Sequence, residues 1–80
     1  MVKVIFVHTM LLRQSGKSRA RAMSTVIFSD GDAFNVLLAE EENGAIVART
    51  GIAIIDRDMR EMAREAVLTD YSERLNANKA

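Results

Sequence analysis

The stretch AFNVLLAEEENGAIVARTGIAII, residues 33–55, decides the fold that we expect from this sequence. Both of its halves are rich in apolar residues, and the dipeptide Asn43-Gly44 stands between them. Asn-Gly readily adopts the positive φ angles of a tight two-residue turn, so it is a strong signal for a β-hairpin. We therefore predict antiparallel strands over residues 33–41 and 45–55, with a bulge or a close backbone approach at Gly51.

The same signals repeat upstream of this hairpin. Residues 2–12 and 23–29 are rich in Val, Ile and Phe, which favour strands. Asp30-Gly31 predicts another tight turn, between residues 29 and 33. The polar segment 13–21 contains a glycine at its centre and is expected to form a loop.

Downstream, residues 56–75 have the pattern of an amphipathic helix. Asp56 is a suitable N-cap because its carboxylate can accept a backbone N–H of the first turn. One stripe of the helix is apolar at the spacing i, i+3, i+4 and i+7: Met59, Met62, Ala63, Ala66, Val67, Tyr71 and Leu75. The expected fold is thus α+β, an antiparallel four-stranded β-meander (ββββα) with one C-terminal amphipathic helix packed on one face.

The length of 80 residues predicts a single small α+β domain over residues 1–80. Met23 suggests a second possibility, a compact unit of residues 23–80 with residues 1–22 as an N-terminal extension strand. A chain this short buries only about 60–65% of the surface it exposes when unfolded. Because it has no cysteine to form a disulfide or a thiolate metal site, we expect it to bury further apolar surface by forming a homodimer. Since nothing in the sequence requires an oxidising compartment, we also expect a cytoplasmic location.

The first strand carries the residues that we assign to the subunit or partner interface. Regular alternation places Val4, Phe6, His8 and Met10 on one face of residues 2–12. The opposite face of this strand is also largely apolar, so we expect both of its faces to pack against other parts of the protein. One helix can cover only part of a four-stranded sheet. A second molecule is the expected source of the other cover.

The formal net charge of zero conceals a segregation of charge along the chain. The first 28 residues contain five basic and no acidic side chains, and residues 29–48 contain five acidic and no basic ones. Within residues 13–21, Arg13, Lys17, Arg19 and Arg21 form a basic loop, which offers a nucleic-acid-binding surface as an alternative function. Such segregation also suits recognition between complementary patches of two proteins.

Catalytic and metal-binding patterns are weak in this sequence. Gly16-Lys17-Ser18 lacks the first glycine of a phosphate-binding loop, and the spacing after Asp30 and Asp32 does not fit a calcium loop. His8 is the single histidine, and the sequence contains no motif for a nucleophile that it could activate as a general base. We predict no catalytic residues, no metal and no cofactor, and the apolar run at residues 2–12 is too short to cross a membrane.

The order of strand, Glu-Glu-Asn-Gly turn, strand and amphipathic helix over residues 34–75 resembles the HicB type of antitoxin domain. That resemblance implies a protein that binds a toxin, although the Pro-Gly element of the family is absent and no functional residue carries over. We expect a small non-enzymatic protein-binding or regulatory module, such as an antitoxin-like protein or a phage- or plasmid-type inhibitor. An enzyme site built at a dimer interface from His8 and the acidic turn residues is the third hypothesis.

Overall fold

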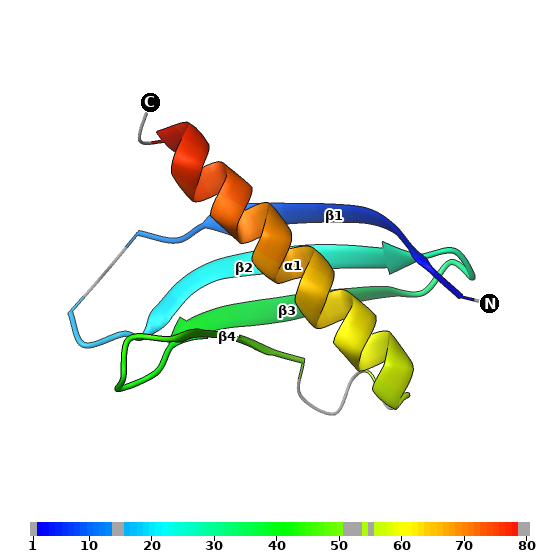
Figure 1. The fold of residues 1–80 in the computed structure, drawn as a ribbon, viewed down its shortest axis with the longest axis horizontal. Coiled ribbons are helices and arrows are strands. Elements are labelled where there is room, and N and C mark those ends of the chain that lie inside the picture. The colour runs from blue at the N-terminus through cyan, green and yellow to red at the C-terminus, as the bar shows by residue number, and fades with distance from the viewer. Residues whose placement is uncertain (1, 14–15, 51–53, 55, 79–80) are drawn as a thin grey trace.

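The computed structural model describes residues 2–13, 16–50, 54 and 56–78. It contains the strands β1 (Val4–Leu11), β2 (Ala20–Phe28), β3 (Ala33–Glu40) and β4 (Ile46–Arg49), followed by the helix α1 (Arg57–Asn78). The strands form one sheet in the order β1-β2-β3-β4, and each neighbouring pair is antiparallel. Figure 1 shows α1 lying diagonally across one face of this sheet. The predicted α+β meander with a C-terminal helix is confirmed.

Both predicted tight turns are present, and each uses its glycine in the left-handed region. Gly31 has a φ of 96° and Gly44 has a φ of 87°, values that residues with a Cβ atom rarely adopt. The carboxylate of Asp30 accepts the N–H of Asp32, and the side-chain oxygen of Asn43 accepts the N–H of Ala45, both at 3.0 Å. These bonds hold the turns in which the meander reverses direction.

The helix begins where its capping residue predicts. Oδ1 of Asp56 accepts the N–H of Met59 at 3.0 Å, and the Asp56 carbonyl accepts the N–H of Arg60 at 3.0 Å. The side chain of Asp56 therefore satisfies one of the donors that every helix N-terminus leaves free. The helix continues to Asn78, three residues beyond the predicted end.

Two strand boundaries differ from the prediction by more than two residues. β2 begins at Ala20, so the last two residues of the expected basic loop belong to a strand. β4 has four residues and ends at Arg49, whereas a strand was predicted over residues 45–55. Ile54 lies outside any strand and is buried in the core, so the apolar character of this segment serves packing as well as strand formation. The bulge predicted at Gly51 lies outside the described residues.

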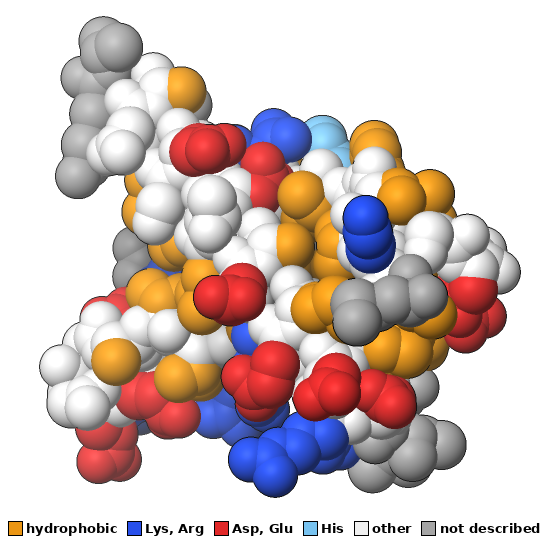
Figure 2. Space-filling view, turned by 45° about the vertical axis from the view of Figure 1, so that its right-hand side comes forward, with side chains coloured by type: hydrophobic (Ala, Val, Ile, Leu, Met, Phe, Trp, Pro, Cys, Tyr) orange, Lys and Arg blue, Asp and Glu red, His pale blue; other side chains and the backbone are white. Residues whose placement is uncertain are grey.

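The solvent side of α1 carries charged residues. Nη1 of Arg64 lies 3.0 Å from Oε1 of Glu61 there. A second pair, in which Nε of Arg74 donates to Oδ2 of Asp70 at 2.9 Å, lies on the side of the helix nearer β1. Figure 2 shows acidic and basic side chains spread over this part of the surface, with patches of hydrophobic side chains between them. In the part of the chain that the structure describes, no helix has the length and apolar character needed to cross a membrane.

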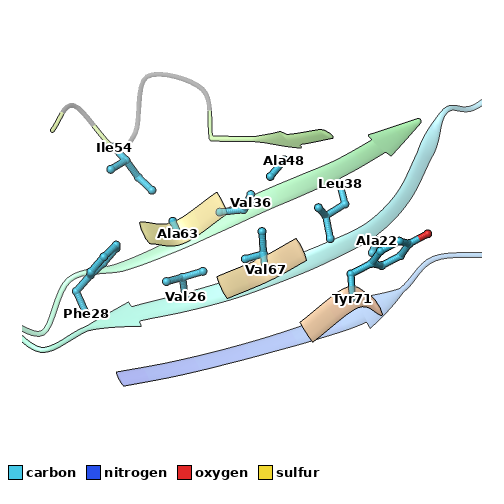
Figure 3. Close-up of a cluster of buried hydrophobic side chains, with 10 residues drawn as sticks. All are labelled: Ala22, Val26, Phe28, Val36, Leu38, Ala48, Ile54, Ala63, Val67 and Tyr71. Carbon is cyan, nitrogen blue, oxygen red and sulfur yellow. The ribbon is translucent and has the colours of Figure 1, made fainter. Parts of the chain in front are cut away.

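The core lies between α1 and the face of the sheet that it covers. Figure 3 shows the side chains of β2, β3 and β4 pointing towards those of the helix. The aromatic rings of Phe28 and Phe34 meet edge to face, with centroids 5.9 Å apart. The buried cluster consists of Ala22, Val26, Phe28, Val36, Leu38, Ala48, Ile54, Ala63, Val67 and Tyr71.

A bulge in β1 changes which of its side chains face the helix. The register between β1 and β2 shifts between Val4 and Phe6. Such a shift inserts one extra residue into a strand and reverses the alternation of the residues beyond it. Val4 and Val7 consequently both line a cleft with Met62 of α1. The predicted shared face of Val4 with Phe6 is wrong for this reason.

Candidate interaction surfaces

The sheet has a second face, turned away from α1, which we call the open face. Its apolar members lie in two rows that run across the strands. Phe6 of β1 pairs with Ile27 of β2, and Met10 of β1 pairs with Met23 of β2, which in turn pairs with Leu37 of β3. Residues directly opposite each other on neighbouring strands share a face, so these side chains form a continuous surface.

Exposure shows how much of this apolar surface reaches the solvent. Phe6 is 49% exposed, Met10 59% and Met23 37%, while Ile27 and Leu37 are half-buried. Single exposed apolar residues are ordinary on protein surfaces, whereas a contiguous group of them marks interaction sites. No other element of the described chain packs over this group, because α1 covers the opposite face.

A polar row separates the two apolar rows. His8 of β1 pairs with Thr25 of β2, which pairs with Asn35 of β3. The hydroxyl of Thr25 donates to Oδ1 of Asn35 at 3.1 Å. Three of the four predicted interface residues, Phe6, His8 and Met10, therefore lie together on the open face, and the fourth packs under the helix.

His8 also touches the C-terminal half of α1 around the edge of the sheet. Nη2 of Arg74 lies 3.1 Å from Nδ1 of His8. A guanidinium group has donors only, so Nδ1 accepts this hydrogen bond and the ring carries its proton on Nε2. Within one chain, His8 pairs with Thr25, whereas Asp30 and Asp32 lie in the exposed turn beyond the end of β2. The hypothetical enzyme site at a dimer interface stays untested.

Beneath this contact, a polar network links the helix to the sheet. The hydroxyls of Thr9 and Ser24 are buried and lie 2.6 Å apart. Burial raises the pKa of the Asp70 carboxyl, but hydrogen bonds from Thr9 and Arg74 and the positive charge of Arg74 outweigh it, leaving that pKa below its usual value. The ionised Asp70 therefore connects α1 to β1 by charge-assisted hydrogen bonds.

The basic loop lies beside the acidic turn. Nε and Nη2 of Arg21 both donate to Oε2 of Glu40, the former at 2.9 Å. The exposed residues Lys17 and Arg19 line one cleft together with all three glutamates of residues 40–42. Arg13 is exposed where β1 leads into the loop. The acidic side chains offset the charge of the loop, and nucleic-acid binding by Arg13, Lys17, Arg19 and Arg21 stays a prediction.

A further group of basic residues borders β4, and we call it the arginine groove. It is an open groove of about 730 Å³ between β4 and the N-terminal half of α1. Arg49 comes from the strand, while the helix contributes Arg57, Arg60 and Arg64. Figure 2 shows basic side chains gathered along the lower edge of the molecule, at the level where α1 begins in Figure 1.

The arginine groove was not predicted from the sequence, although the helix carries one local signal of it. Positions 57, 60 and 64 are three and four residues apart, so their side chains share one side of a helix. Arg49 joins them only through the packing of α1 against the sheet, which no local pattern reveals. Among the described residues, no group of three or more His, Asp or Glu side chains could hold a metal ion.

No protein-family model matches the sequence, no curated protein matches it, and no solved structure matches the fold. The function must therefore be argued from the surfaces of the chain itself.

Proposed function

We propose that this protein is a small non-enzymatic protein-binding module that works as a homodimer, with the cytoplasm as its expected compartment. Its role would be that of a regulator or inhibitor that occupies the surface of another protein. The observation that carries the proposal is the open face, on which Phe6, Met10 and Met23 are exposed together. A second copy of the chain would cover this face.

The physical argument rests on the apolar area of a short chain. Burying a side chain of the size of Phe or Met contributes about 1.5–3 kcal/mol. Two apolar rows separated by one polar row suit twofold pairing, because an isologous contact brings the same patch of both subunits together. His8, Thr25 and Asn35 would lie within such a contact and supply polar groups that fix its register.

The test measures the molar mass of the protein in solution by light scattering. We expect the wild-type chain to have twice its monomer mass of 8.9 kDa. Met23→Lys places a charge in the centre of the open face, on a central strand, and should give a monomer.

Ser72→Lys provides the matched control, because it adds the same charge at an exposed position on α1. This variant should keep the mass of the wild type. A monomeric wild-type chain, or a Met23→Lys variant that remains dimeric, would contradict a homodimer formed through the open face.

A further inference from the structure

The structure places four arginine side chains along the terminal strand of the sheet, and we infer that the arginine groove binds an extended, carboxylate-rich segment of a protein partner. The inference rests on the proposed function, since it names the kind of partner that a protein-binding module would take. It concerns a surface at the β4 edge that is lined by different residues from the apolar rows of the open face.

Charge is the first argument for this occupant. The groove is lined by four arginines and two glutamates, which gives it a net charge of +2 in a chain whose formal net charge is zero. Glu41 lies 3.5 Å from Arg49, and Glu61 lies 3.0 Å from Arg64. The groove therefore retains an excess of positive charge that an anionic partner would neutralise.

Preorganisation is the second argument. Nε of Arg64 donates to the Ala48 carbonyl at 3.4 Å, and Nη1 of Arg60 donates to the Ile54 carbonyl at 3.5 Å. These bonds hold two guanidinium groups against the backbone before any partner arrives. A group that is already ordered loses less conformational entropy on binding, so each contact contributes more to affinity.

The dimensions suit an extended peptide. Arg60 and Arg64 are four residues apart, a distance of about 6 Å along the helix. In an extended chain, alternate side chains point the same way at intervals of about 7 Å. Two carboxylates at alternate positions of a peptide could therefore each reach a guanidinium fork, which binds carboxylates by two parallel hydrogen bonds.

A nucleic-acid strand fits the same groove less well. Single-stranded nucleic acids are held by aromatic side chains on which the bases stack, and none of the residues that line the groove is aromatic. Asp56 and Asp58 are exposed at the start of α1 and would repel a continuous row of phosphates. A peptide avoids this repulsion because its charges occur only at selected positions.

The test uses a fluorescein-labelled, end-capped hexaglutamate peptide and measures its anisotropy at fixed low ionic strength. Wild-type protein should bind this peptide and not capped hexaglutamine. The double variant Arg57→Gln, Arg60→Gln should bind it at least about tenfold more weakly, as expected for the loss of charge-assisted hydrogen bonds. Arg57→Gln alone, an exposed position, should give an intermediate loss.

Arg13→Gln, Lys17→Gln is the matched control, because it removes the same charge from the basic loop. It should change the affinity by less than about threefold. The inference is overturned if the wild type does not bind hexaglutamate, if both double variants lose affinity equally, or if a thymidine hexanucleotide binds as tightly as the peptide.

Light scattering on the same samples separates this inference from the proposed function. Loss of hexaglutamate binding with an unchanged dimer mass in Arg57→Gln, Arg60→Gln supports the groove. A wild-type dimer that does not bind the peptide overturns the groove inference alone. A wild-type monomer that binds it overturns the homodimer and leaves the groove in place.

Discussion

Thr9 and Ser24 put two hydroxyl groups beneath α1, where the surrounding side chains are apolar. Each hydroxyl has one proton to donate. The Thr9 hydroxyl shares a hydrogen bond with the Ser24 hydroxyl, and hydrogen bonding from Thr9 also lowers the pKa of Asp70 by stabilising its ionised form. This chain of hydrogen bonds links β1 both to its neighbour β2 and to the helix.

Replacing Thr9 by valine tests this chain. Thr9→Val keeps the shape of the side chain, but it removes the partner of the buried Ser24 hydroxyl and a hydrogen bond that stabilises the ionised form of Asp70. We expect a loss of about 1–3 kcal/mol in the free energy of unfolding, measured by urea denaturation. Thr69→Val, an exposed position of α1, should change stability by less than about 0.5 kcal/mol. Equal stability of the two variants would show that the buried chain contributes nothing.

Single residues also mark the limit of what the sequence reveals about the sites. Phe6, His8 and Met10 were placed together correctly because alternation in a strand is a local rule. Val4 was misplaced because the bulge beside it depends on pairing with β2, which is a contact between distant parts of the chain. Arg49 and Arg57 meet in one groove only after the helix has packed.

At the scale of elements, α1 and β1 are joined by an electrostatic contact as well as by apolar packing. The side chain of Asp70 is 16% exposed and bonded to Arg74, and its pKa is lowered in the folded protein. A carboxyl group whose pKa is lower in the folded state stabilises the protein above its unfolded pKa, which is about 3.9 for Asp. This stabilisation is lost as the pH falls through the pKa of the folded state.

Asp70→Asn should therefore alter the pH dependence of stability. At neutral pH we expect the variant to be less stable by about 1–2 kcal/mol, because it loses a charge-assisted contact between the helix and β1. Below about pH 4, the stability of the wild type should fall more steeply than that of Asp70→Asn. Urea denaturation at a series of pH values measures both effects. Glu73→Gln, an exposed position of the same helix, is the control, and identical acid profiles for wild type and Asp70→Asn would contradict the prediction.

The order of the elements could be predicted because each carries its own local signal. Asp30-Gly31 and Asn43-Gly44 fix the two tight turns, and the spacing of apolar residues from Met59 onwards fixes the helix. The end of β4 could not be predicted in this way. Ile54 fits a strand by its β-branched side chain, yet it fills the core from outside the strand.

At the scale of the whole molecule, the charge segregation has a structural explanation. In an antiparallel meander, alternate connections lie at the same end of the sheet, so residues 16–19 and 41–45 are neighbours. The basic loop and the acidic turn meet there, as the bonds from Arg21 to Glu40 show. The topology predicted from sequence already implies this meeting. The segregated charges therefore contact each other within one chain.

The position of β1 bears on whether residues 23–80 can fold alone. Val7, Thr9 and Leu11 of β1 face the helix, and Ala22 belongs to the buried cluster. Removal of residues 1–22 should therefore abolish the cooperative thermal transition measured by circular dichroism. Addition of a synthetic peptide of residues 2–22 should restore it by supplying the missing strand. A cooperative transition of the truncated chain alone would show that residues 1–22 are an extension of a smaller folded unit.

The packing of the last described element on the first strand has a consequence for biosynthesis. The ribosome makes the four strands before α1, and the meander can form as it emerges because each strand pairs with the one made just before it. Until the helix leaves the exit tunnel, Val26, Val36 and Leu38 remain uncovered, and the nascent sheet exposes apolar side chains on both of its faces. The interval before α1 docks is thus the period in which this chain exposes most apolar surface, and such exposure favours aggregation.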